Sequence, residues 1–301
     1  MRKFFIISIL TTIGTLCSGG GCHTFEAKPI GTNCQASLDK SLTPVGQNGE
    51  WNLVFSDEFN GPSLDPDKWT TCYWWDDNGC TIASNDEMQW YQPDDVLVDD
   101  GLLILRAQKR SINAYKRHTH GYSRFDYTSG MVTTGRDNSN KATPVRFVFQ
   151  YGYAEIRAKV PRGKGLWPAF WLLPEDHNSK PEIDVMEIYG DHPDTIEMNF
   201  HYINSYGRTS KRDSSWTGPD FAAGFHTFAV DWRPDAIIWY VDGIERWRYS
   251  DAEYIPDIPM YVLVNLAVGG AGPGAPDAST SFPSYFEIDY VRIWCRATPA
   301  D

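Results

Sequence analysis

Three carboxylates lie within six residues in the segment Glu182-Ile183-Asp184-Val185-Met186-Glu187. The remaining positions are apolar, as in a buried strand, where an unpaired charge is costly. Acidic groups this close cannot all ionise cheaply, so the pKa of one of them should rise. An ionised carboxyl opposite a protonated one is the pair that cleaves glycosidic bonds. The segment therefore predicts a glycoside-cleaving site, the alternative being an acidic edge strand that faces solvent.

The spacing of these acids needs a particular local geometry. Side chains alternate along a strand, so Glu182 and Asp184 share one face and Glu187 points to the other. A β-bulge at Val185-Met186 would return Glu187 to the first face, and we predict that bulge. The two glutamate Cα atoms then lie about 13 Å apart, and leaning side chains reach the separation of about 5–5.5 Å used by retaining glycosidases. Asp184 can hydrogen-bond one of the two carboxylates.

A second motif precedes the acids, the run Trp167-Pro168-Ala169-Phe170-Trp171. Together with Glu-Ile-Asp-x-x-Glu it resembles glycoside hydrolase family 16, in the bulged branch of laminarinases (endo-β-1,3-glucanases) and bacterial exopolysaccharide glycanases. The resemblance spans residues 51–295. It continues through six ordered segments, namely Phe55–Gly61, Asn85–Tyr91, Tyr151–Glu155, Trp239–Gly243, Leu266–Gly270 and Asp289–Ile293.

This resemblance implies roles for the acids and for residues around them. Glu182 would be the nucleophile, Asp184 its assistant and Glu187 the acid/base. The other implied substrate-binding residues are the sugar-stacking Trp167 and Trp171, His201 near the scissile bond, and the loop residues Asn85 and Glu87.

The resemblance further implies a structural Ca²⁺ away from the groove, with no cofactor needed for catalysis. Its ligands would be the carboxylates of Glu58 and Asp289 and the carbonyl of Gly101. Oxygen ligands suit Ca²⁺, and the alternative is that these are ordinary surface carboxylates.

Short apolar or alternating runs separated by turn residues recur from Trp51 onward, and nothing in the sequence has the pattern of a long amphipathic helix. This pattern predicts an all-β sandwich or barrel. Asp242-Gly243 between two apolar runs predicts a tight hairpin. The family resemblance narrows the fold to a β-jelly-roll sandwich of two antiparallel sheets with a concave substrate groove.

The N-terminal region has the pattern of an export signal over residues 1–21, with basic residues, an apolar stretch and small residues in turn. Cys22 allows a lipoprotein reading. We expect a linker over 22–48, the catalytic domain over 49–297 and a tail over 298–301. The protein is then secreted or periplasmic, or an outer-surface lipoprotein anchored at Cys22.

Four cysteines follow the signal, and in an exported chain they predict two disulfides with three possible pairings. We favour Cys72–Cys80, which closes a short loop, and Cys34–Cys295, which joins the two ends of the chain. The spacing does not match a zinc site.

Composition narrows the class of partner. The net charge of −12 argues against a nucleic acid, and a content of 12 Trp and 16 Tyr suits stacking on sugar rings. We expect a monomer without a protein partner, acting on a polysaccharide.

The leading functional hypothesis is a retaining endo-β-1,3-glucanase of laminarinase type. Alternatives within the enzymes are a β-1,3-1,4-glucanase, a succinoglycan-type exopolysaccharide glycanase, an agarase-type galactan hydrolase and a wall-remodelling transglycosylase. The non-enzyme alternative is a glucan-binding protein on the same fold, although such relatives usually lose the catalytic glutamates.

Overall fold

The computed structural model describes residues 38–73, 79–116, 119–136, 145–176 and 178–297. The predicted export signal, Cys22 and the tail lie outside these residues. Within them, no helix is both long and apolar enough to span a membrane.

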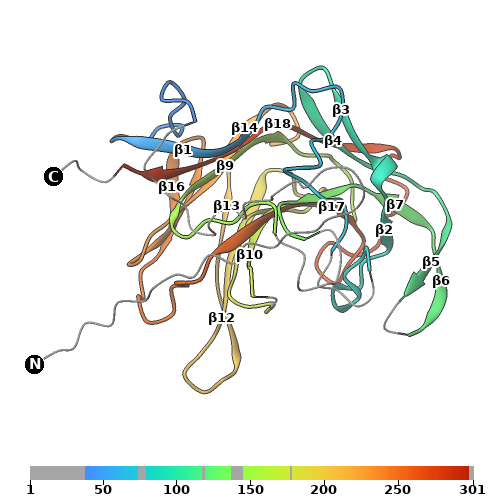
Figure 1. Ribbon diagram of the computed structural model, residues 1–301. Helices are drawn as coiled ribbons and strands as arrows, with labels where there is room; N and C mark the ends of the chain where they lie inside the picture. The colour runs from blue at the N-terminus through green and yellow to red at the C-terminus, as the bar shows by residue number, and fades with distance from the viewer. Residues whose placement is uncertain (1–37, 74–78, 117–118, 137–144, 177, 298–301) are drawn as a thin grey trace, which may run out of the picture. The chain divides into compact units, whose positions relative to one another are not determined.

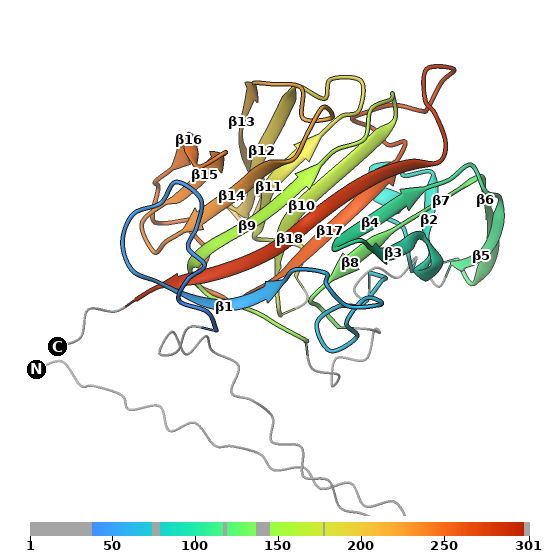
Figure 2. The same cartoon turned by 90° about the horizontal axis from the view of Figure 1, so that it is seen from above.

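Two antiparallel sheets form two layers (Figure 1), which confirms the predicted sandwich. The larger sheet has the order β16-β15-β14-β9-β18-β4-β3, and β1 pairs with β18. Its strands are β1 (Trp51–Asp57), β3 (Val96–Asp99), β4 (Leu102–Ala107), β9 (Gly152–Lys159), β14 (His226–Trp232), β15 (Ile237–Val241), β16 (Ile244–Tyr249) and β18 (Ser284–Arg296). Figure 2 shows β14, β9, β18 and β1 lying side by side in this layer.

The smaller sheet carries the acidic motif and has the order β13-β12-β11-β10-β17-β8. Its strands are β8 (Met131–Thr133), β10 (Leu166–Pro174), β11 (Glu182–Ile188), β12 (Thr195–Ile203), β13 (Thr209–Thr217) and β17 (Met260–Val268). Two further pairs complete the fold, the parallel pair β2 (Gln89–Tyr91) and β7 (Tyr127–Ser129), and the hairpin β5 (Ile112–Lys116) and β6 (Gly121–Phe125). The 3₁₀ turns are η1 (Ala83–Asn85) and η2 (Pro93–Asp95).

The main core lies between the sheets, and the alternation along each strand explains how it forms. In β17, Val262 and Val264 point into the core shared with Ile156 of β9, because successive side chains take opposite faces. Tyr261 and Leu263 take the other face and join a second apolar cluster. This second cluster forms the floor beside the acidic motif.

The turn at Asp242-Gly243 has the predicted hairpin geometry. Val241 pairs with Ile244 across β15 and β16. Asp242 has φ 50° and Gly243 has φ 75°, and positive φ at both central residues is what a type I′ turn requires.

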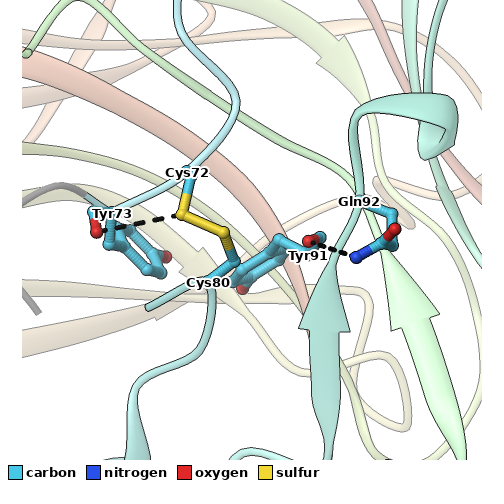
Figure 3. Close-up of a disulfide and its surroundings, with 5 residues drawn as sticks. All are labelled: Cys72, Tyr73, Cys80, Tyr91 and Gln92. Carbon is cyan, nitrogen blue, oxygen red and sulfur yellow. Dashed lines mark hydrogen bonds between the residues drawn. A yellow bond between two sulfur atoms is a disulfide. The ribbon is translucent and has the colours of Figure 1, made fainter. Parts of the chain in front are cut away.

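Cys72 and Cys80 form a disulfide with Cα atoms 4.9 Å apart (Figure 3), which confirms that prediction. Cys80 is held against β2, where the Tyr91 amide donates to the Cys80 carbonyl at 2.7 Å. Cys34 lies outside the described residues, so its pairing with Cys295 stays a prediction.

The end of the expected linker contacts the larger sheet. The Leu38 amide donates to the Leu53 carbonyl at 2.8 Å, the Trp294 indole donates to the Leu42 carbonyl at 2.9 Å, and the Val45 amide donates to Glu155 at 3.2 Å. The domain boundaries themselves stay predictions.

Glu155 is a buried acid, 1% exposed, that also accepts a hydrogen bond from the Tyr290 hydroxyl at 2.9 Å. Burial raises its pKa to about 7, above the value in an unfolded chain. The folded state therefore binds the proton more tightly, and stability is lost as pH rises from about 4.5 through about 7. The loss should be on the order of 2–3 kcal/mol.

We therefore expect Glu155→Gln to unfold like wild type at pH 4.5 and to be more stable than wild type at pH 8. The amide can accept from Val45 and donate to the Tyr290 oxygen, so both contacts survive. Urea unfolding at the two pH values measures this, since other titrations cancel in the difference. A stability difference that is the same at both pH values would contradict the expectation.

Candidate active site

The strand register of β11 contains the predicted bulge. On β10, Ala169 pairs with Glu187 and Trp171 pairs with Asp184. The two paired positions are two residues apart on β10 but three residues apart on β11. On the other side, Asp184 pairs with Asn199 and Glu187 pairs with Glu197, which are only two residues apart on β12. The extra residue lies within Val185-Met186, which confirms the bulge and its position.

The bulge brings all three acids to one cleft of about 440 Å³. Asp184 is only 4% exposed, and its carbonyl accepts the indole N–H of Trp239 at 2.8 Å. Trp239 lies on β15 in the other sheet and is fully buried. This contact ties the bulged strand to the main core.

Glu187 has the setting of a general acid. Its Oε1 accepts the indole N–H of Trp167 at 2.9 Å, and its Oε2 accepts the side-chain amide of Asn199. Burial, followed by the negative charges of Asp184 and Glu182, raises its pKa well above the usual range. A carboxyl that stays protonated can give its proton to a leaving oxygen.

Glu182 has the opposite setting. Its Oε2 accepts from Lys180 Nζ at 2.6 Å, and its Oε1 lies 3.7 Å from His201 Nε2. That nitrogen is also 3.3 Å from Asp184 Oδ2. Burial lowers the pKa of His201, and burial together with Glu182 raises that of Asp184. Lys180 thus places a positive charge directly against the Glu182 carboxylate.

The two predicted stacking tryptophans both line the cleft, but they are held differently. Trp167 is half-buried and meets Tyr189 edge to face, with ring centroids 5.7 Å apart. Trp171 is only 7% exposed, and its indole donates to Asn265 on β17 at 2.8 Å. Trp171 thus forms part of the floor, and a stacking role for either ring stays a prediction.

Asn85 and Glu87 line the adjoining part of the cleft. Glu87 accepts from the Ile82 amide at 3.1 Å, from the Asn85 side chain at 3.3 Å and from Gln89 at 2.6 Å. This carboxylate organises its own loop, while Asn85 also lines the larger cleft beside Trp167.

The predicted calcium ligands are engaged by arginines. Arg292 donates to both oxygens of Glu58, at 2.8 and 2.6 Å, and Arg157 donates to Asp289 at 2.5 Å. Gly101 lies in the turn between β3 and β4 with φ 74°. Two guanidinium groups already balance the carboxylates, so the side chains do not fit a calcium ion as they stand.

Only one other group of possible metal ligands occurs among the described residues, and it lies in the cleft. Atoms of Glu182, Asp184 and His201 fall within 4.8 Å of one another. The Lys180 ammonium at 2.6 Å already supplies a positive charge there, so we assign no metal to this group.

The fold brings into the cleft several residues that were not predicted from the sequence. Lys180 lies two residues before Glu182, the first residue of the acidic motif. Asn199 lies two residues before His201 on β12, so Asn199 and His201 share one face of that strand. Tyr189 and Lys211 also line the cleft. The alternation of Asn199 and His201 on one strand could have identified Asn199.

Comparison with known proteins agrees with this geometry. Residues 84–292 match the model of the family described as "Glycosyl hydrolases family 16". The sequence is 37% identical over 255 residues to endo-1,3-1,4-beta-glycanase EglC of Rhizobium meliloti (strain 1021), covering 80% of this chain and 51% of that protein. It is 33% identical over 270 residues to a beta-glucanase of Rhodothermus marinus, and this match covers 81% of this chain and 85% of that protein.

Among solved structures, the laminarinase catalytic domain of Thermotoga maritima is similar to this chain, with a TM-score of 0.70 and 31% identity. The match covers 82% of this chain and 99% of that domain. By contrast, this chain spans only about half the length of the Rhizobium protein.

Proposed function

Since this chain belongs to glycosyl hydrolases family 16, we propose that it is a retaining endo-glycosidase that hydrolyses internal β-1,3 bonds of a β-glucan. The observation that carries the proposal is the unequal setting of two carboxylates in one cleft. Glu182 is paired with an ammonium at 2.6 Å, whereas burial and neighbouring negative charge raise the pKa of Glu187. One is suited to attack and the other to donate a proton.

The mechanism follows from these two settings. In the first step a Glu182 oxygen bonds to the anomeric carbon while Glu187 gives its proton to the departing glycosidic oxygen. In the second step the ionised Glu187 takes a proton from water, which attacks the same carbon and releases Glu182. Two inversions at that carbon give net retention of configuration.

A second substrate class has support of its own. The Rhizobium meliloti relative is named as an endo-1,3-1,4-beta-glycanase, so mixed-linkage glucan or a succinoglycan-type polymer is the alternative substrate. A non-catalytic glucan-binding protein would not need the paired carboxylates, both of which are present in the cleft.

Release of reducing ends from laminarin, curdlan, lichenan, agarose and a succinoglycan-type polymer tests the proposal. We expect the highest rate on laminarin, with oligosaccharides of mixed length as early products. Glu245→Ala is a matched control, since Glu245 is an exposed acid on β16 that pairs with Arg248. Activity on lichenan alone would assign the alternative substrate, and binding without cleavage of any polymer would contradict the proposal.

Export, a monomeric state and the absence of a protein partner are also proposals. Export is supported by the sequence pattern of residues 1–21 and by a polymeric substrate, which is found outside the cell. Recovery of activity from the culture medium, and gel filtration of the purified chain, test them.

Structural calcium at Glu58, Gly101 and Asp289 is a separate proposal, and the ion would have to displace Arg292 and Arg157 from the two carboxylates. If it does so, removing metal with EDTA lowers the melting temperature and added calcium restores it. A melting temperature unchanged after verified metal removal would end this proposal.

A further inference from the structure

Lys180 and Glu182 form an ion pair at the edge of the catalytic cleft. Lys180 lies two residues before Glu182, the first residue of β11, and its Nζ lies 2.6 Å from Glu182 Oε2. The side chains are 19% and 18% exposed, respectively. Pairs in full solvent contribute little, but this pair is shielded enough for its electrostatic interaction to be substantial.

The three acids of the motif differ in whether a basic side chain pairs with them. Among the described residues, Lys180 is the one lysine or arginine that forms a salt bridge to any of these acids, and its partner is Glu182. The basic partner of Asp184 among the described residues is His201, whose Nε2 lies 3.3 Å from Asp184 Oδ2. Burial lowers the pKa of His201. Glu187 accepts from the neutral groups of Trp167 and Asn199. Lys180 therefore distinguishes Glu182 from the other two carboxylates.

The groups around Glu182 explain why a counter-charge is needed there. Asp184 and Glu187 are acidic neighbours on the same strand, and burial, followed by neighbouring carboxylates that include Glu182, raises the pKa of both. His201 faces Glu182 from β12. Tyr261 on β17 interacts electrostatically with Glu182, and burial holds the pKa of Tyr261 far above neutrality. Trp171 on β10, Lys211 on β13 and Glu197 on β12 also line the cleft, and of these three Lys211 and Glu197 have ionisable side chains.

We propose that Lys180 is a positioning residue that fixes one oxygen of the Glu182 carboxylate and compensates its charge, so that Glu182 is selected as the nucleophile. This inference rests on the proposed retaining hydrolysis. When the Glu182 oxygen bonds to the sugar, its charge disappears and Lys180 loses its partner. When water attacks the anomeric carbon, the bond between that carbon and Glu182 breaks, its electron pair returns to the Glu182 oxygen, and Lys180 stabilises the departing carboxylate.

The test uses an aryl β-glycoside of a laminari-oligosaccharide, whose leaving group needs no proton. Its kcat/KM at varied pH then has an acidic limb that reports ionised Glu182 without a contribution from Glu187. In Lys180→Met we expect this limb to move to higher pH by about one to three units, as for loss of an adjacent opposite charge. Lys180→Arg keeps the charge, so its limb should remain near that of wild type.

Lys159→Met provides a matched control, because Lys159 forms a partly buried pair with Glu287 in the larger sheet, away from the cleft. Its acidic limb should coincide with that of wild type. Lys180→Gln serves as a second neutral variant if the methionine variant does not fold, as judged by thermal melting. An acidic limb unmoved in the folded neutral variant, or moved equally in Lys180→Arg, would overturn the inference. A wild-type enzyme that cleaves neither glucan nor aryl glycoside would instead refute the proposed function.

Discussion

Glu182→Ala is expected to abolish hydrolysis of every substrate, with a loss of at least about 10⁴-fold, because the covalent step loses its nucleophile. Lys180 cannot attack in its place, since its ammonium has no free electron pair. Activated aryl glycosides should be affected as strongly as polysaccharide, because a good leaving group does not replace a nucleophile.

Azide gives this prediction a specific chemical readout. In the space left by the Glu182 side chain, azide can attack the anomeric carbon directly and yield a glycosyl azide of inverted configuration. Rescue of Glu182→Ala by azide, with that configuration in the NMR spectrum, identifies the missing group as the nucleophile. The matched control Glu245→Ala should keep wild-type activity. Substantial hydrolysis by Glu182→Ala without azide would contradict the assignment.

Glu187→Ala should reduce polysaccharide hydrolysis by about 10²- to 10⁴-fold, the usual contribution of a general acid. Formation of the covalent intermediate from an aryl glycoside with a good leaving group should be largely spared, because that step needs no proton. The pH profile should change as well. The pKa of Glu187 is raised, so wild-type activity on polysaccharide falls as pH rises through that value and the proton is lost.

The Glu187→Ala profile on the activated substrate should therefore lack the basic limb. Azide should again accelerate turnover, but with retained configuration, since it attacks the intermediate formed by Glu182. Initial rates on laminarin and on the aryl glycoside across pH measure both effects. Laminarin hydrolysis within a few-fold of wild type would show that another group donates the proton.

The chemistry was more predictable from sequence than the setting of each residue. The acidic motif on an apolar strand predicts the bulge, because only one added residue can bring Glu187 to the face of Glu182. The turn at Asp242-Gly243 is likewise a local property of two residues.

Contacts across strands were not predictable in the same way. Asn199 reaches Glu187 only through the register between β11 and β12, and register depends on the whole sheet. Trp171 lies four residues after Trp167 and so was expected to stack on a sugar. Its indole instead donates to Asn265 on β17, and the ring is buried in the floor of the cleft. The arginines that pair with Glu58 and Asp289 come from β18 and β9.

The central claim, that Glu182 attacks the sugar, is tested most directly by trapping the intermediate. A 2-deoxy-2-fluoro laminari-oligosaccharide with an activated leaving group forms the covalent bond but hydrolyses slowly. Fragmentation mass spectrometry of the labelled peptide then locates the ester. We predict that the sugar is attached to Glu182 and that the label is absent from Glu182→Ala. An ester on Asp184 or Glu187, or no label on an enzyme that cleaves laminarin, would contradict the claim.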